Sequence, residues 1–476
     1  MTFSRRDFFL SSGAVLAAGC SARLFGPRQT ETVRQLTILY TNDEHGWMEP
    51  YQETGGAAGV ARLWRERENV TAEGPFLVLS GGDMWTGPAL STALAGESMA
   101  DVMNAMGYQA AALGNHDFDF GLQALRARSA QSAFPFLSAN LRDRQTGDIP
   151  DFATPFLIRE VNGIQVGVIG LTTTETAVDT RPEVVSGLRF LQYKDVLPET
   201  VAAVREQGAE LVILLSHLCA SETRALAPLA AELGIPLIGG GHCHEEIDEV
   251  LEGVQLIESG YFLRGYVRVE LLFDRQAGKA LEMRVELVRN RTGRLDPGVQ
   301  DRMAEWRSRL DPALWQPIGY ADQQISRTAP EMAALLLPGW LRAWPGAEVA
   351  LAEPRYVQQD LYPGDITPAT FIGLLSTTNQ LVEIELSGAE LLEVMESRHP
   401  LIWGAAHSGE LLQADRRYRV LVPDALYHGG WYYRFQELDP DPVFTGIDWR
   451  DPTVGWVREL QSSEAQPIAS RLPVSP

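Results

Sequence analysis

Five short stretches of this sequence contain residues that bind metal ions or transfer protons. One of them, Asn115-His116-Asp117-Phe118-Asp119, places an amide, an imidazole and two carboxylates within five residues. It follows a small apolar run at 108–113, and Gly114 between them allows a sharp turn. A hydrophobic core does not gather polar groups in this way. The other candidates are Asp43 and His45, then Asp83, then His217, and finally His242 and His244.

These side chains suit a pair of divalent metal ions. Imidazole, carboxylate and amide ligands, with no thiolate required, fit ions such as Mn, Zn, Fe, Co or Mg. Two ions about 3.5 to 4 Å apart, bridged by a carboxylate and a hydroxide, would use all the candidates, which are too many for one ion. Such a pair activates water and neutralises an anionic substrate, so the pattern predicts phosphate-ester hydrolysis. The seven candidate ligands are Asp43, His45, Asp83, Asn115, His217, His242 and His244.

Each candidate follows an apolar run that predicts a buried strand. For any single residue, a capped turn or a surface histidine is the simpler explanation, but this does not account for the same placement at five strand ends. Ligands in α/β sheets gather beyond the carboxyl ends of strands, so we expect these side chains to meet at one edge. Strands are expected at 36–40, 76–80, 108–113, 211–217 and 236–238, with one at 165–171 that carries no evident ligand.

Length and composition predict two globular domains. The chain has 476 residues, of which 45% are hydrophobic and 21% charged, and this length exceeds one ordinary domain. Strands alternate with helical patterns at 59–68, 90–106 and 196–208, which predicts an α/β first domain. We expect this domain at 35–290, a helical linker at 291–317 and a smaller second domain of mixed pattern at 318–476.

The net charge of −22 limits the partners of the chain. It would repel polyanions, which excludes nucleic-acid polymers as partners. A small anionic substrate can still bind where divalent metals supply positive charge.

Residues 1–20 are typical of an export signal. Arg5-Arg6 precedes a small-residue apolar stretch that is too short to span a membrane, and the pattern resembles a twin-arginine signal. It ends in Ala17-Ala18-Gly19-Cys20, which is similar to a lipoprotein cleavage site. We therefore expect a periplasmic protein that can be membrane-anchored through lipidated Cys20, followed by a linker at 21–34. The alternatives are a general secretory signal and cleavage without lipidation.

Only three cysteines are present, which excludes a disulfide framework. If Cys20 is lipidated, Cys219 and Cys243 remain, and both lie beside predicted ligands. We expect these two to be unpaired, with a single disulfide between them as the alternative.

The candidate motifs resemble those of the calcineurin-like dinuclear metallophosphoesterases. Neighbouring residues, such as Phe118-Asp119-Phe120-Gly121 and Ser138-Ala139-Asn140-Leu141, narrow the resemblance to the 5'-nucleotidase family over about residues 35–290. It implies an α/β metallophosphoesterase β-sandwich flanked by helices, followed by a smaller α+β C-terminal domain. The five motifs are Asp43-x-His45, Gly82-Asp83, Gly114-Asn115-His116-Asp117, Ser216-His217 and Gly241-His242-Cys243-His244.

The resemblance also implies a role for each candidate. His116 would act on the phosphoryl group or leaving group, positioned by Asp119, and a structural histidine is the alternative. Asp117 is expected to support the turn, and Asp83 to bridge the ions. One ion would be bound by Asp43, His45, Asp83 and His244, and the other by Asp83, Asn115, His217 and His242.

The second domain resembles the family less closely. Stretches 361–367 and 379–388 have residue patterns similar to those of the family's C-terminal domain, but the motifs that contact substrate in that family are altered here. Thr377 and Ala425 stand where that family has the two aromatic rings that sandwich a nucleobase. The remaining candidates for substrate binding are Arg355, Asn379, Tyr427 and Trp431.

The leading hypothesis is an exported phosphoesterase that acts on small phosphate esters. One alternative is a sulfur-compound hydrolase of thiosulfohydrolase type, which shares this fold and metal centre. Another is a lipid-anchored binding protein without catalysis, and the intact ligand set argues against it.

Overall fold

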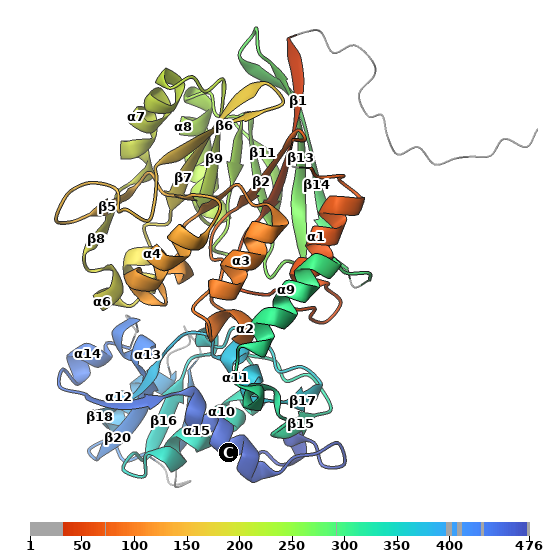
Figure 1. Cartoon of the computed structure of the whole chain (residues 1–476). Helices are drawn as coiled ribbons and strands as arrows, with labels where there is room; N and C mark the ends of the chain where they lie inside the picture. Colours follow the sequence, from red (N-terminus) through yellow and green to blue (C-terminus); the bar gives the residue numbers. More distant parts are fainter. Residues whose placement is uncertain are drawn as a thin grey trace, which may run out of the picture.

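The computed structural model describes residues 32–71, 73–291, 293–396, 402–406, 412–429 and 433–473. It confirms an α/β domain followed by a smaller C-terminal domain, which lies below the first in Figure 1. The export signal expected at 1–20 and Trp431 lie outside the described residues. Within the described ranges, no helix is long and apolar enough to cross a membrane.

The first domain is a sandwich of two six-stranded sheets. Across the first sheet, the strands are β14 (Lys279–Arg289), β13 (Gly265–Asp274), β1 (Val33–Thr41), β2 (Phe76–Ser80), β3 (Ala110–Ala112) and β4 (Phe136–Leu137). Across the second, they are β11 (Glu246–Leu251), β12 (Val254–Ser259), β10 (Leu237–Gly239), β9 (Leu211–His217), β7 (Ile164–Thr172) and β6 (Phe156–Val161). The strands β1, β2 and β3 are parallel, as are β7, β9, β10 and β12.

Apolar side chains fill the space between the sheets. Ile38 and Leu77 of the first sheet belong to the same buried cluster as Ile213 and Leu237 of the second. Because helices cover the outer faces, these strands are buried on both sides and read as continuous apolar runs. The helices on the first sheet are α1 (Gly56–Glu66), α3 (Glu97–Met106) and α4 (Gly121–Gln131), and those on the second are α7 (Tyr193–Glu206) and α8 (Ala220–Glu232).

The helix expected at 90–106 is interrupted. It forms α2 (Ala89–Thr92) and α3, separated by a turn in which Ala95 and Gly96 have φ of 46° and 77°. Gly96 lies against the Trp85 indole, where a Cβ would be 2.7 Å from Cγ. The helical spacing continues across this break, so the pattern alone did not predict it.

The expected linker contains α9 (Pro297–Ser308), which packs on the first domain. Asp296 caps it by accepting from the Val299 N–H at 3.0 Å. Trp306 donates its indole N–H to Asp101 at 2.9 Å and belongs to the core beneath α1 and α3. The helix therefore has a fixed place beside the sandwich.

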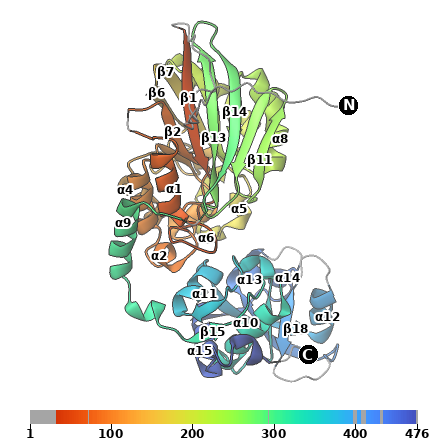
Figure 2. The same cartoon turned by 90° about the vertical axis from the view of Figure 1, so that its right-hand side faces the viewer.

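The C-terminal domain is built on a five-stranded sheet with helices on both faces. In Figure 2, its helices α11 (Pro368–Leu374) and α13 (Asp424–Gly429) face the first domain near α2. The strands in order are β19 (Trp403–Ala406), β16 (Val349–Ala352), β20 (Arg417–Pro423), β18 (Gln380–Ser387) and β21 (Val443–Asp448). A small sheet joins β15 (Gly319–Ala321) to β17 (Gly364–Ile366), and the other helices are α10 (Pro330–Ala343), α12 (Gly388–Glu396), α14 (Phe435–Leu438) and α15 (Arg450–Leu460).

Candidate metal centre

The candidate ligands lie at one edge of the sandwich, beyond strands of both sheets. Thr41 pairs with Ser80 in parallel register, so the loops that follow β1 and β2 begin side by side at the same edge of the first sheet. The pairing of β9 with β10 does the same in the second sheet. The first sheet supplies Asp43, His45, Asp83 and Asn115, and the second supplies His217, His242 and His244.

The loops that carry these ligands have an uncommon backbone. Five ligands adopt the left-handed conformation, which costs about 1 to 3 kcal/mol for a residue other than glycine. Such strain gathers at functional sites, where the surrounding structure enforces it. The φ angles are 51° at Asp43, 46° at His45, 58° at Asp83, 74° at His242 and 59° at His244.

The first ligand group consists of Asp43, His45 and His244. Nε2 of His244 lies 3.4 Å from Asp43 Oδ1 and 3.2 Å from His45 Nε2. One ligand atom from each of the three residues lies within 4.8 Å of the others. Two imidazole nitrogens and a carboxylate oxygen that converge in this way fit a divalent cation.

The second ligand group consists of Asp83, His217 and His242, which converge within the same limit of 4.8 Å. Oδ1 of Asn115 is buried and has no hydrogen-bond partner in the described part of the chain. Nε2 of His217 is also buried and makes no hydrogen bond of good geometry there, although Asp83 Oδ2 lies 3.1 Å away. Buried polar atoms are normally satisfied. These two atoms therefore fit ligands to a metal ion.

Asp83 lies between the two groups. Its Oδ2 is 3.1 Å from His217 Nε2 and 3.7 Å from His45 Nε2. Its Oδ1 accepts the backbone N–H of His116 at 2.8 Å. The side chain thus occupies the place that a bridging carboxylate needs.

His116 lies beside the first group, with its ring centroid 5.3 Å from that of His45. Its Nδ1 is 2.8 Å from Asp119 Oδ2, which leaves Nε2 as the nitrogen that can face a substrate. Arg181, which the sequence did not indicate, donates to the backbone oxygen of Asp119 at 3.0 Å. The pair His116 and Asp119 is therefore held from a second segment of the chain.

Asp117 supports the turn, as expected. Its Oδ2 accepts the N–H groups of Gly114 at 2.8 Å and Asp83 at 3.1 Å, and its Oδ1 accepts that of Met84 at 2.8 Å. Burial and the charge of Asp83 raise the pKa of Asp117 to about 7. This carboxyl group ties the loop after β2 to the loop after β3.

The imidazoles differ in their affinity for protons. Burial lowers the pKa of His45 to about 4. Burial has the same tendency at His217, but the charge of Asp83 outweighs it and raises the pKa to about 10. At His116, the charges of Asp119 and Asp83 likewise outweigh burial and raise the pKa to about 10. An environment that favours a proton at His217 also favours a cation in its place.

The carboxylates beside β1 also differ. Although burial favours the neutral acid, the charge of His244 holds the pKa of Asp43 at about 2. Burial instead raises the pKa of the neighbouring Glu44 to about 8. Glu44 accepts hydrogen bonds from Thr41 at 2.5 Å and Ser80 at 2.8 Å, and so links the ends of β1 and β2 behind the centre.

Asn42 clamps Asp43, a role that the sequence analysis missed. Its Nδ2 donates to Asp43 Oδ2 at 2.7 Å and to the Gly260 carbonyl at 2.6 Å. Its Oδ1 accepts the N–H of Ser259 at 2.7 Å and the hydroxyl at 2.8 Å. One amide therefore joins the two sheets beside the first group, and its position next to Asp43 was the available signal.

The sequence analysis also missed an acidic pair at the two ends of α5 (Thr176–Asp179), formed by the N-cap residue Glu175 and by Asp179. Glu175 Oε2 and Asp179 Oδ2 lie 3.6 and 3.9 Å from Nε2 of His242. Burial raises the pKa of Asp179, and the charges of His242 and Arg355 partly oppose the rise. Arg355 belongs to the C-terminal domain and pairs with Glu353 at 2.8 Å. Of the predicted substrate-binding residues that the structure describes, Arg355 is thus the one whose charge acts on this acidic pair beside His242.

Two other substrate-binding candidates are buried within the C-terminal domain. Asn379 is 3% exposed and donates to the Thr377 hydroxyl at 2.9 Å. Tyr427 is 5% exposed, packs in the hydrophobic core and donates to the Asp439 carbonyl at 2.9 Å. Both side chains stabilise the domain itself, and substrate binding by either of them stays a prediction. Trp431 lies outside the described residues.

Cys219 and Cys243 form a disulfide, with Cα atoms 5.1 Å apart. The expectation that they are unpaired was wrong. Because β9 and β10 are parallel neighbours, the loops that follow them leave the sheet side by side. Cys219 comes two residues after His217, and Cys243 lies between His242 and His244. The disulfide therefore fastens the two ligand loops of the second sheet together.

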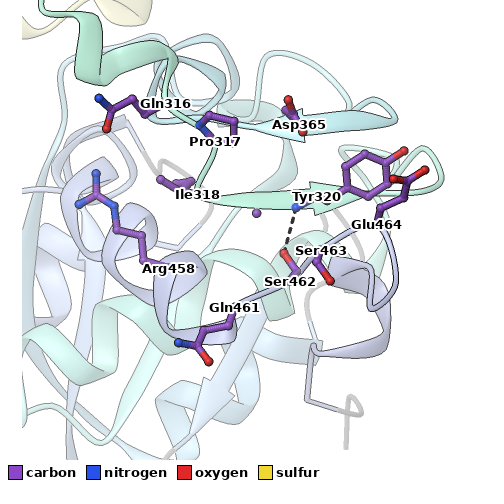
Figure 3. Close-up of a pocket in the computed structure, with 11 residues that line it drawn as sticks. Gln316, Pro317, Ile318, Tyr320, Asp365, Arg458, Gln461, Ser462, Ser463 and Glu464 are labelled. Carbon is purple, nitrogen blue, oxygen red and sulfur yellow. Dashed lines mark hydrogen bonds between the residues drawn. The ribbon is translucent and has the colours of Figure 1, made fainter.

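A separate cavity of about 790 Å³ lies in the C-terminal domain (Figure 3). It is lined by residues of β15 and of the turn after α15, and the Tyr320 N–H donates to the Ser462 hydroxyl at its wall at 3.0 Å. It contains none of the predicted site residues. The candidate chemistry therefore lies elsewhere, at the edge of the sandwich.

Two family models match the chain on either side of α9. The model of calcineurin-like phosphoesterases covers residues 36–246, which include all the candidate ligands. The model of the 5'-nucleotidase C-terminal domain covers residues 320–414. The chain thus has the two-domain organisation of the 5'-nucleotidases, a calcineurin-like phosphoesterase domain followed by a 5'-nucleotidase C-terminal domain.

Two relatives named 5'-nucleotidase align with between half and two thirds of this chain. A 5'-nucleotidase of Vibrio cholerae is 34% identical over 266 residues, which are 52% of this chain and 47% of that protein. A rat 5'-nucleotidase is 28% identical over 329 residues, which are 62% of this chain and 55% of that protein. The alignments thus span about half the length of these relatives.

Solved structures of the same fold cover nearly the whole chain. A 5'-nucleotidase precursor from Thermus thermophilus superposes with a TM-score of 0.77 at 22% identity, over 90% of this chain and 97% of its own. The sulfate thiohydrolase SoxB from the same organism gives 0.72 at 20% identity, over 92% and 95%. At this identity the likeness shows a shared fold, which both chemistries use.

Proposed function

We propose that this protein is a dinuclear-metal phosphoesterase that hydrolyses small phosphate esters, in the manner of the 5'-nucleotidases. The observation that carries this proposal is the position of Asp83 between two convergent ligand groups at one edge of the sandwich. Two divalent ions, when bound, would supply an activated water and positive charge for the phosphoryl group. That charge offsets the net −22 of the chain where an anionic substrate must bind.

The protein's own residues would orient and protonate the substrate. His116 is placed to hold a proton, because in the metal-free protein the charges of Asp119 and Asp83 overcome burial and raise its pKa to about 10. Its Nε2 can donate to a phosphoryl oxygen or to the oxygen of the leaving group. Asp119 fixes the ring from the other side at 2.8 Å.

Substitution of His217 tests the metal centre. We expect His217→Ala to lower the metal content of protein dialysed against Mn²⁺ from two ions towards one, and to abolish hydrolysis of AMP and of an aryl phosphate. The exposed His428 provides the matched control, since His428→Ala should change neither. A parent protein that binds fewer than two ions, or a His217→Ala variant that retains both, would contradict the proposal.

Sulfur-compound hydrolysis is the second candidate function. It is supported by the TM-score of 0.72 with the sulfate thiohydrolase SoxB, and by the missing rings at Thr377 and Ala425. A panel of phosphate esters and sulfur-linked substrates separates the two. Turnover of the sulfur compounds alone would replace the proposed function.

We further propose export of the protein and its anchoring through Cys20. The support is the sequence of residues 1–20. Cys20→Ser should release the protein from the membrane fraction while its melting temperature stays the same. Unchanged fractionation would reject lipidation.

A further inference from the structure

The ligand histidines are not held in the same way. Nδ1 of His45 lies 2.9 Å from the Thr86 carbonyl, and Nδ1 of His217 lies 2.8 Å from the Gly81 carbonyl. Such a bond fixes the rotation of the ring and leaves Nε2 for the metal. Within the described ranges, no group accepts from Nδ1 of His244, whose side chain is 31% exposed. Something else must hold this ring.

The ring of Tyr261 lies against the imidazole of His244. Their centroids are 4.8 Å apart and their planes differ by 18°, which is a stacked arrangement. The pairing of β11 with β12 explains the contact, because His244 comes just before β11 and Tyr261 just after β12. The Gly260 N–H closes this end of the hairpin by donating to the Glu245 carbonyl at 2.9 Å.

Arg264 holds Tyr261 in turn. Its guanidinium carbon lies 4.2 Å from the centroid of the Tyr261 ring, and its Nη1 donates to the Tyr261 hydroxyl at 2.5 Å. A second hydrogen bond from Arg264 reaches the hydroxyl of Tyr51. The tyrosine ring is therefore fixed both by cation–π contact and by a hydrogen bond.

We propose that Tyr261, held by Arg264, is the positioning residue for His244. Stacking turns the imidazole so that its Nε2 faces Asp43 Oδ1 at 3.4 Å, where the first ion would bind. This inference rests on the proposed two-metal function and adds a residue outside the ligand motifs. The inference also predicts that loss of Tyr261 affects only the first of the two ion sites, because Tyr261 contacts a ligand of the first group only.

Two variants of Tyr261 separate stacking from other effects. Tyr261→Leu removes the ring, whereas Tyr261→Phe keeps the ring and removes the hydroxyl. Tyr320→Leu, a half-buried tyrosine of the C-terminal domain, is the matched control. Mn²⁺ titration followed by electron paramagnetic resonance reports the affinity of each ion without relying on activity.

We expect Tyr261→Leu to lower the affinity for one of the two Mn²⁺ ions by about 10- to 100-fold, which is the range for residues that orient metal ligands. The other ion, and both ions in Tyr261→Phe and Tyr320→Leu, should bind as in the parent. Three results would overturn the inference. They are unchanged Mn²⁺ affinity in Tyr261→Leu, an equal loss of affinity for both ions in that variant, and the same loss in Tyr261→Phe as in Tyr261→Leu. A parent that binds fewer than two ions would instead contradict the proposed function, and the inference would fall with it.

Discussion

At the scale of single residues, the neighbours of Asp83 determine where its carboxylate lies. Its N–H donates to Asp117, and its Oδ1 accepts the N–H of His116 at 2.8 Å. Gly114 provides the space, since a Cβ there would lie 2.1 Å from Oδ1. Oδ2 is thus left for the imidazoles of both groups. A side chain already held in place loses little further freedom when an ion binds, which favours affinity.

His116 should serve catalysis without serving metal binding. We expect His116→Ala to keep both ions and to slow turnover by about 100- to 10,000-fold, because proton donation to the leaving group is lost. Metal content and kcat for an aryl phosphate are measured on the same sample, with His428→Ala as the control. Loss of metal together with activity would show that His116 is structural.

Glu258 should make the metal-free protein less stable as the pH rises. Burial and the charge of Asp43 raise the pKa of Glu258 to about 9, so the folded state keeps a proton that the unfolded state releases near the ordinary pKa of 4.5. Between about pH 5 and about pH 8, Glu258 alone should therefore lower the free energy of unfolding by up to about 1.4 kcal/mol for each pH unit.

Urea unfolding of EDTA-treated protein measures this slope. Glu258→Gln should make the slope shallower by this contribution, whereas Glu252→Gln, at an exposed position in the same hairpin, should leave it unchanged. Equal slopes in the parent and in Glu258→Gln would show that this carboxyl group does not hold its proton.

At the scale of elements, the disulfide acts on two loops that both carry ligands. Loss of the link between Cys219 and Cys243, which are 24 residues apart, should cost about 3 kcal/mol in the free energy of unfolding. The double variant Cys219→Ser, Cys243→Ser should also bind Mn²⁺ more weakly, since His217, His242 and His244 lose a common tether.

Dithiothreitol supplies the control for this variant. It should weaken Mn²⁺ binding by the parent to the level of the double variant and leave the variant itself unchanged. If the parent binds Mn²⁺ equally well with and without the reductant, the tether does not matter for the site.

The sequence could predict the strands and their polar ends because both follow from local patterns. A buried strand of a parallel sheet is a run of apolar residues, and the residues that follow it mark the ligand edge. Contacts between loops have no such pattern. The stacking of Tyr261 on His244, the clamp from Asn42 to Ser259 and the disulfide depend on which strands become neighbours. These contacts became visible only in the fold.

At the scale of the whole molecule, the C-terminal domain should recognise substrates weakly. The rings expected at Thr377 and Ala425 are absent, and Tyr427 is buried. Stacking of a base is worth about 1 to 3 kcal/mol, which is about 5- to over 100-fold in affinity. We therefore expect kcat/KM for an aryl phosphate to be comparable with that for AMP.

Steady-state kinetics with AMP, ribose 5-phosphate and an aryl phosphate measures this preference. A preference for AMP above about 100-fold would mean that a base pocket exists. Trp431→Ala would then show whether that residue supplies the platform, since it should remove the preference.

Each ligand group draws residues from both sheets: Asp43 and His45 meet His244, and Asp83 meets His217 and His242. Two bound ions would therefore join one layer of the sandwich to the other at its carboxyl edge. At the opposite edge the layers are joined by apolar packing, by the ion pair of Arg275 with Glu210 and by the hydrogen bond from Asn162 to the Gln35 carbonyl. Removal of the ions should then loosen the molecule at one end. Hydrogen exchange should accelerate in the loops after β1, β2, β9 and β10 and stay slow at the amino ends of the same strands. The metal ions would thus stabilise the fold at this edge as well as take part in catalysis.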